Sequence, residues 1–186
     1  MNVEPLTIPD VLLLTPRRFH DPRGFFSETW NETRFTAAGI SGPFVQDNHA
    51  VSNARGVLRG LHCQIGRNAQ GKLIRVVKGA IWDVAVDIRH GSPSHGQHVA
   101  VVLTSKDGEQ LFIPEGFAHG FCTLEPDTEV IYKVNRYYSP EHDRGMLWND
   151  PALQISWPIP VEGPVMSEKD KHHPCFAELP KYFTYG

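Results

Sequence analysis

The sequence lacks most features that mark secreted, membrane-spanning or disulfide-stabilised chains. Its three cysteines are odd in number and form no Cys-x-x-Cys pair: Cys63, Cys122 and Cys175. This pattern argues against a disulfide framework and against a structural zinc site. The apolar run at residues 11–14 is far too short for the core of a signal peptide or for a membrane span. We therefore expect a reducing, cytoplasmic setting.

A large excess of charge of one sign is also missing. The net charge is −3 over 186 residues, with no basic stripe or tail. A nucleic-acid partner is therefore not expected, although local arginines and lysines remain able to bind a small phosphorylated ligand. The hydrophobic fraction of 40% is ordinary for a globular protein. We expect residues 1–186 to form one domain around one sizeable core.

Short apolar segments recur every eight to twelve residues between about residues 45 and 135, separated by glycine and proline. The expected strands are 72–77, 80–88, 99–103, 109–113, 121–124 and 130–134. Residues 99–103 and 109–113 are expected to pair as a hairpin around the turn at 105–108. In segment 80–88, Asp83 and Asp87 either point into a polar barrel interior or face solvent, and we expect solvent. The spacing predicts an all-β sandwich or barrel.

The two ends of the chain have less regular patterns. Residues 5–19 are expected to be extended, and after a turn at 21–24 a strand is expected to carry Phe26, Glu28 and Trp30 on alternate positions. A short helix is expected at 31–38, with Asn31 as its cap and Gly39 ending it. Residues 44–49 are interpreted as a loop, with Gln46 and Asn48 on one face if extended. Residues 137–186 look irregular, with a helix cap at Ser167 and an acidic first turn reaching Asp170.

The stretch at residues 56–77 places five polar or charged side chains among apolar ones: Arg59, His62, Gln64, Lys72 and Arg75. A regular strand would send Arg59 and His62 to opposite faces, whereas a bulged strand would bring both toward one pocket. His62 titrates near neutral pH and Lys72 is a cation. We hypothesise a proton-transfer base beside charges that hold an anionic substrate. The alternative is a satisfied interior histidine and a solvated lysine.

One motif points to a particular kind of barrel. The spacing Gly108-x5-Pro114-x-Gly116-x2-His119 matches the second motif of the cupin jelly-roll barrels, in which the histidine often binds a metal. The other ligands there come from a His-x-His pair, but this chain has His62-Cys63-Gln64 instead. A first-row metal needs three or more imidazole or carboxylate donors. We therefore expect no catalytic metal, which leaves His62 and His119 for proton transfer or hydrogen bonding.

Taken together, the motifs resemble one family, the dTDP-4-dehydrorhamnose 3,5-epimerases, over residues 5–172. The matching segments are Asp21-Pro-Arg-Gly-Phe-Phe-Ser-Glu28, Gln46-Asp-Asn48, Gly56-Val-Leu-Arg-Gly-Leu-His62, Lys72-Leu-Ile-Arg-Val-Val-Lys-Gly79, Trp82-Asp-Val-Ala-Val-Asp-Ile-Arg89, Ile113-Pro-Glu-Gly-Phe-Ala-His-Gly-Phe121, Ile131-Tyr-Lys133, Trp148-Asn-Asp-Pro151 and Ser167-Glu-Lys-Asp170. The resemblance implies a cupin-like jelly-roll barrel with short peripheral helices. It also implies an epimerase that uses no metal and no cofactor, in a pathway that makes rhamnose for a surface polysaccharide.

The resemblance also implies roles for four catalytic residues. His62 would be the base that removes a proton beside the ketone of a 4-keto sugar, and Asp170 would orient it. A carboxylate partner fixes the tautomer of an imidazole. Lys72 would stabilise the enolate oxygen, whose charge develops only as the proton leaves. Tyr132 would deliver a proton to the opposite face.

The remaining implied roles concern substrate binding. Arg23 and Arg59 would meet the diphosphate, since guanidinium groups suit oxyanions. The other implied contacts are Tyr138 stacked on thymine, Glu28, Gln46 and Asn48 on the base or deoxyribose, His119 in the sugar pocket, and Asp143 and Lys169 on the substrate. Two positions depart from the commonest family pattern: Cys63 replaces an aromatic residue, and Asp143 replaces a glutamate and is one methylene shorter.

The family resemblance further implies a homodimer in which N-terminal strands within residues 5–30 cross to the partner. Arg23 and Glu28 would then act in the other subunit's site. Three rival functions stay open at this stage. They are an epimerase acting at C3 only, a metal-dependent cupin oxygenase using His62 and His119, and a nucleotide-sugar binding protein without catalysis.

Overall fold

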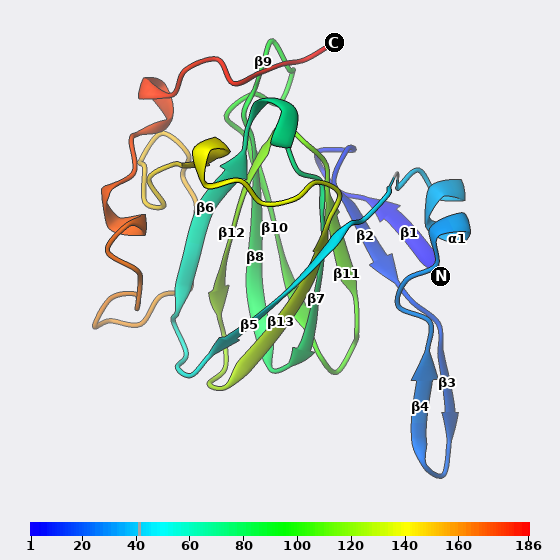
Figure 1. Cartoon of the computed structure of the whole chain (residues 1–186). Coiled ribbons are helices and arrows are strands. Elements are labelled where there is room, and N and C mark those ends of the chain that lie inside the picture. The colour runs from blue at the N-terminus through cyan, green and yellow to red at the C-terminus, as the bar shows by residue number, and fades with distance from the viewer. Residues whose placement is uncertain (41) are drawn as a thin grey trace.

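The computed structural model describes residues 1–40 and 42–186, and most of its regular structure is antiparallel β-sheet (Figure 1). A six-stranded sheet has the order β1-β2-β11-β7-β13-β5, formed by Asn2–Pro5, Leu12–Thr15, Gln110–Ile113, Lys72–Lys78, Thr128–Val134 and Gln46–Ser52. A five-stranded sheet has the order β10-β8-β12-β6-β14, formed by His98–Thr104, Ala80–Asp87, Phe117–Thr123, Leu58–Gln64 and Asp143–Gly145. The expectation of an all-β, jelly-roll architecture is confirmed.

The smaller elements lie around these two sheets. They are the β3–β4 hairpin (Arg18–Asp21 and Gly24–Ser27), α1 (Glu32–Ala37), the parallel pair β9 and β15 (Arg89–His90 and Phe183–Thr184), and four short 3-10 helices at Gly66–Asn68, Pro140–His142, Asp170–His172 and Phe176–Glu178. Within the described part of the chain, no helix is both long enough and apolar enough to cross a membrane.

The main core lies between the two sheets. Ile74 and Val76 of β7 pack with Ile81 and Ala85 of β8 and with Phe121 of β12, all of them buried. Tyr132 of β13 packs against the edge of this cluster. The inner faces of both sheets are thus apolar at one end of the barrel, which leaves the other end for polar side chains.

Two further clusters cover the outer faces of the sheets. Phe35 of α1 packs with Leu14, Leu73 and Phe112 on the six-stranded sheet. On the five-stranded sheet, Leu61, Val84 and Val86 pack with Met146 and Leu153 from the C-terminal region. The chain beyond β13 thus buries the outer face of β8, and the six-stranded sheet buries its other face, which carries Ile81 and Ala85. Asp83 and Asp87 lie on that second face, between the sheets, so the expectation that they face solvent is wrong.

Several local expectations are confirmed and others are wrong. The helix forms as Glu32–Ala37, and the Asn31 side chain caps it by accepting from the Arg34 N–H. The interpretation of residues 44–49 as a loop is wrong, because Gln46–Ser52 pairs along its full length with β13. The strand after the N-terminal turn ends at Ser27, so Glu28 and Trp30 lie beyond it.

The strands β10 and β11 also correct the prediction. They were expected to pair with each other, yet β10 pairs with β8, and β11 pairs with β7 and β2. The Ser105–Gly108 turn therefore carries the chain from one sheet to the other. Local turn chemistry signals a reversal, but it does not specify which neighbour each strand takes.

Strand β6 contains the expected irregularity. His62 pairs with His119, and three residues earlier Arg59 pairs with Phe121, which is only two residues from His119 on β12. The extra residue on β6 interrupts the alternation of faces. Gly60 adopts φ +127°, and a Cβ there would meet the Cα of Gly120 at 2.5 Å. Glycine thus permits the close approach of the two strands at this point.

Candidate active site

A cavity of about 510 Å³ opens between the two sheets. Seven of the residues predicted to act on the substrate line it: Arg59, His62, Lys72, His119, Tyr132, Lys169 and Asp170. His62 comes from β6 of the five-stranded sheet, whereas Lys72 and Tyr132 come from β7 and β13 of the six-stranded sheet. The cavity is thus bounded by titratable groups on two opposite walls.

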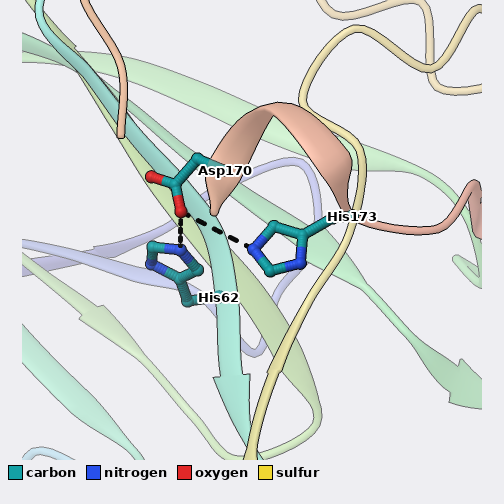
Figure 2. Close-up of side chains that lie close together, drawn as sticks. All are labelled: His62, Asp170 and His173. Atoms are coloured by element: carbon teal, nitrogen blue, oxygen red, sulfur yellow. Dashed lines mark hydrogen bonds and ion pairs between the residues drawn. The ribbon is translucent and has the colours of Figure 1, made fainter. Parts of the chain in front are cut away.

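His62 and Asp170 form the closest polar pair in the cavity. Nε2 of His62 lies 2.7 Å from Oδ1 of Asp170 and donates a hydrogen bond to this carboxylate oxygen (Figure 2). Oδ2 of Asp170 accepts from the Gly60 N–H at 3.3 Å, and Oγ of Ser167 accepts from the Asp170 N–H at 3.2 Å. This bonding fixes the tautomer of His62 and leaves Nδ1 free to accept a proton from a ligand.

The environment keeps Asp170 ionised. Burial raises the pKa of Asp170, but the hydrogen bond and charge of His62 and the Gly60 N–H outweigh burial, so the pKa ends below its ordinary value. The carboxylate side chain is only 6% exposed, whereas the imidazole is 31% exposed. An anchored carboxylate behind a partly open imidazole is the arrangement of a general base.

Two further groups face this pair from the other sheet. Burial lowers the pKa of Lys72, whose Nζ donates to the His62 carbonyl at 3.4 Å. Burial raises the pKa of Tyr132, with the nearby Arg59 opposing this effect, so the phenol keeps its proton at neutral pH. The cavity therefore combines an imidazole, a half-buried amine and a protonated phenol.

His119 is held by a partner that the sequence pattern misassigned. Its Nε2 donates to Oδ1 of Asp83 at 2.8 Å, and both side chains are buried. Burial lowers the pKa of His119, against the effect of the Asp83 charge. Asp83 was expected in solvent. Asp87 was also expected in solvent, yet it is fully buried and accepts hydrogen bonds from Arg89, Ser92 and Ser94.

A smaller cavity of about 180 Å³ shares His62, Lys72 and Tyr132 with the larger one. Four more predicted binding residues line it: Gln46, Asn48, Tyr138 and Asp143. Gln46 and Asn48 share a face of β5, as expected, and are bonded to each other at 2.9 Å. Asp143 accepts from Gln64 at 3.1 Å and forms an ion pair with Lys169. Eleven of the thirteen predicted residues thus surround two adjoining cavities.

The other two predicted residues lie elsewhere in this chain. Arg23 is at the turn of the β3–β4 hairpin, 89% exposed and paired with Asp21. Glu28 is bonded to Arg34 and lines a separate cavity of about 390 Å³ with Asn48 and Arg75. The hairpin extends away from both sheets (Figure 1).

Two residues beside the cavity were missed by sequence reasoning. Asp83 lies on the same face of β8 as Ala85, and Ala85 pairs with His119 of β12. Knowledge of the pairing between β8 and β12 would have been needed to place Asp83 beside His119. His173 lies 3.6 Å from Asp170 and stacks edge-on against His62. It belongs to the tail after Lys171, for which no role was assigned, and only the fold brings it to the cavity.

The fold and the cavity define a class: an all-β enzyme with a cupin-like jelly roll and titratable groups between its two sheets. The family model described as dTDP-4-dehydrorhamnose 3,5-epimerase matches residues 5–178. The enzyme of that name from Shigella flexneri is 52% identical over 96% of this chain and 97% of its own length. The chain belongs to the dTDP-4-dehydrorhamnose 3,5-epimerase family, and is an enzyme of the isomerase class.

Solved structures agree with this assignment. A dTDP-6-deoxy-D-glucose-3,5-epimerase from Legionella pneumophila, in complex with dTDP-4-keto-L-rhamnose, has a TM-score of 0.95 at 39% identity and covers 100% of this chain and 98% of that one. A dTDP-4-dehydrorhamnose 3,5-epimerase from Bacillus anthracis, with TDP and PPi bound, has a TM-score of 0.90 at 47% identity. The match covers 94% of this chain and 98% of that one.

Proposed function

We propose that this protein inverts C3 and C5 of dTDP-4-dehydro-6-deoxy-D-glucose to give dTDP-4-dehydro-L-rhamnose. The observation that carries the proposal is the His62–Asp170 pair, 2.7 Å apart, in a cavity that Lys72 and Tyr132 face from the opposite sheet. The Legionella relative holds the product of this reaction. Full-length relatives named for the same activity support the same substrate.

The proposed chemistry follows from the ketone at C4. A carbonyl acidifies the C–H bonds on both neighbouring carbons, so Nδ1 of His62 removes the proton from C3 or C5 and the electron pair moves to O4. Lys72 stabilises the negative oxygen, which develops only as the proton leaves. Tyr132 protonates the carbon from the opposite sheet and hence from the opposite face. Addition on the other face inverts the centre. His62 then gives its proton to solvent and Tyr132 takes one up, and the same sequence at the second carbon completes the reaction.

The proposed roles for the binding residues follow their positions. Arg59 lies at the cavity wall and meets the diphosphate. Lys169 and Asp143 contact the substrate where the two cavities join. Tyr138, 51% exposed, stacks on the thymine beside Gln46 and Asn48. His119, fixed by Asp83, lines the sugar pocket.

We also propose a homodimer in which the N-terminal hairpin reaches the partner's site. Three phenylalanines of the hairpin are exposed: Phe19 at 50%, Phe25 at 55% and Phe26 at 70%. Large apolar side chains grouped on a projecting segment are typical of an interaction surface. In this arrangement Arg23 and Glu28 complete the nucleotide pocket of the second subunit.

Exchange in D2O tests the reaction directly. The protein is incubated with dTDP-4-dehydro-6-deoxy-D-glucose, and the sugar is analysed by NMR. Deuterium at both C3 and C5 is expected, together with the L-configured product. Label confined to C3 would reject the double inversion in favour of a C3-only epimerase. No label with intact substrate binding would instead identify a binding protein, and oxygen-dependent turnover with a bound metal would identify an oxygenase.

A further inference from the structure

His173 places a second imidazole on the carboxylate that orients His62. Its Nε2 is 3.6 Å from Oδ1 of Asp170, the same oxygen that accepts from His62 (Figure 2). The centroids of the two imidazoles are 5.7 Å apart, at 82° to each other. One donor atom from each of the three side chains lies within 4.8 Å of the other two.

Nothing in the described part of the chain satisfies this nitrogen. Nε2 of His173 is buried without a hydrogen-bond partner, and the side chain is 10% exposed. At 3.6 Å the contact with Asp170 is too long for a hydrogen bond. A Cβ on Gly145 would meet the His173 ring at 2.2 Å, so a glycine in β14 leaves the space that the imidazole fills. Buried polar atoms without partners are rare in native proteins and call for an explanation.

We propose that His62, Asp170 and His173 form a binding site for a zinc-like divalent transition metal. Two imidazoles and one carboxylate are donors that Zn²⁺ accepts, with nitrogen and oxygen at about 2.0–2.2 Å. Donors around a tetrahedral ion at these bond lengths lie roughly 3.3–3.6 Å apart. The His173–Asp170 separation already matches this spacing, and the His62–Asp170 pair has to lengthen to match it.

The surroundings provide the rest of such a site. The Gly60 N–H holds Oδ2 of Asp170 and so directs Oδ1 toward both imidazoles. The cavity reaches two of the three ligands, His62 and Asp170. Lys169 is paired with Asp143, and burial lowers the pKa of Lys72, which reduces the repulsion that a cation would meet. This site differs from the cupin position, because Nε2 of His119 is bonded to Asp83.

Metal binding at this position would inhibit the proposed reaction. The ion takes the lone pair of His62 Nε2 after the proton on that nitrogen has left. The neutral, ligated imidazole then carries its one proton on Nδ1, which can no longer accept a proton from the sugar. This consequence depends on the proposed function, whereas the binding of the ion does not.

Titration of the metal-free full chain with Co²⁺ and Zn²⁺ tests the site. We expect one equivalent of Co²⁺ to give the visible absorption of a low-symmetry four-coordinate site and Zn²⁺ to displace it. His173→Asn should weaken binding at least about tenfold, since even loss of a residue outside the ligand set costs 10–100-fold. The matched control is His172→Asn, because His172 is exposed and bonded to the Glu168 carbonyl. It should bind like the wild type.

The outcomes separate the two proposals. The metal site would be overturned if the wild type, His173→Asn and His172→Asn bound the metal with equal affinity. It would also be overturned if both variants lost the same amount of affinity. If His173→Asn does not fold, as judged by its metal-free melting curve, His62→Gln replaces it as the ligand variant and should weaken binding similarly. In the activity assay, Zn²⁺ should inhibit the wild type and a chelator should restore it. A protein that binds the ion but never exchanges substrate protons would contradict the proposed function alone.

Discussion

At the scale of single residues, the site depends on two hydrogen-bonded side chains, His62 and Asp170, that differ in burial. Asp170 is buried and anchored by a backbone N–H, whereas His62 is partly exposed to the cavity. Because the carboxylate is bonded on both oxygens, the imidazole can turn only by breaking a 2.7 Å hydrogen bond. In the proposed mechanism, Asp170 therefore sets the orientation of the His62 imidazole.

Replacing Asp170 by asparagine should slow turnover far more than it weakens binding. The amide keeps the size of the side chain but loses the charge that favours the required His62 tautomer. General-base catalysis contributes about 10²–10⁴-fold, so kcat should fall within that range while KM changes little. Steady-state kinetics of Asp170→Asn measure this. The control is Glu168→Gln, an exposed neighbour paired with Lys171. A rise in KM with unchanged kcat would contradict the positioning role.

Replacing Tyr132 by phenylalanine should separate the two proton transfers. The pKa of Tyr132 is raised by burial, so the phenol is available as an acid. When the Tyr132 hydroxyl is absent, His62 can still remove and return a proton on one face of the sugar. Deuterium should therefore continue to enter at C3 while the yield of inverted sugar falls steeply. If exchange and inversion decline by the same factor, Tyr132 is not the acid on the second face.

At the scale of elements, one extra residue in β6 decides which side chains meet. Without the register shift opposite β12, Arg59 and His62 would lie on opposite faces of the strand. With it, both line the same cavity. Gly60 lies inside this irregular part of β6 and also donates to Asp170. Strand geometry and the orientation of the base are therefore linked through one glycine.

Gly60→Ala should destabilise the protein more than Gly91→Ala does. Both glycines have positive φ, +127° and +85°, but only Gly60 is in close contact with a neighbouring backbone. Positive φ alone costs a non-glycine residue roughly 1–3 kcal/mol. The clash with Gly120 should add to that cost. Urea unfolding of both variants measures the difference, and equal losses would show that β12 moves away freely.

Asp87 provides a second prediction at this scale, at the end of β8. Burial raises its pKa, but bonds from Arg89, Ser92 and Ser94 lower it to about 2 overall. A carboxylate whose pKa is lower in the folded than in the unfolded state stabilises the fold at pH values above its unfolded-state pKa. This stabilisation is lost as the pH falls from about 4 to 2. The Asp87→Asn variant should therefore have a free energy of unfolding at least about 2 kcal/mol lower than that of the wild type at pH 7.

The difference between Asp87→Asn and the wild type should shrink when unfolding is measured near pH 3. Asp47→Asn is the control, since Asp47 is 62% exposed and its ion pair with Lys133 is a surface pair. Such pairs contribute about 0–1 kcal/mol. A pH-independent difference for Asp87→Asn would mean that lost packing, not lost charge, causes the effect.

At the scale of the whole molecule, the residues predicted to contact the nucleotide do not all lie in one cavity of the chain. Arg59 and Lys169 line the main cavity, whereas Arg23 lies on the projecting β3–β4 hairpin and Glu28 lines a different cavity. A second copy of the chain is the arrangement proposed above to bring them together. The hairpin would then be part of the active site and also part of the interface.

The double variant Phe25→Ser, Phe26→Ser should weaken the dimer and raise the KM for the nucleotide sugar. Both rings are exposed in the single chain, and burying a phenylalanine contributes about 1.5–3 kcal/mol. Sedimentation velocity should show a shift toward monomer. Val102→Ser, which removes an exposed side chain of β10, should leave the mass unchanged. A wild type that sediments as a monomer at every concentration would refute the exchanged hairpin.

Much of the fold was predictable because its signals are local. Apolar alternation and glycine turns identified β7, β8, β13 and the last three residues of β12, and an asparagine cap identified α1. The loop assigned to residues 44–49 failed because β5 is a half-exposed strand with polar outward positions. The hairpin expected between β10 and β11 failed because strand partners are chosen by packing between distant segments.

The sequence by itself determined the residue types of the site and their family motif, since each motif is a short run read along the chain. Only the tertiary structure decided that Asp83 and Asp87 are buried, that Asp170 accepts from His62, and that His173 shares the same carboxylate. Residues 62 and 170 are 108 positions apart, and no periodicity connects them. Their contact arises because the chain after β13 folds back over the five-stranded sheet, where burying its apolar side chains is favourable.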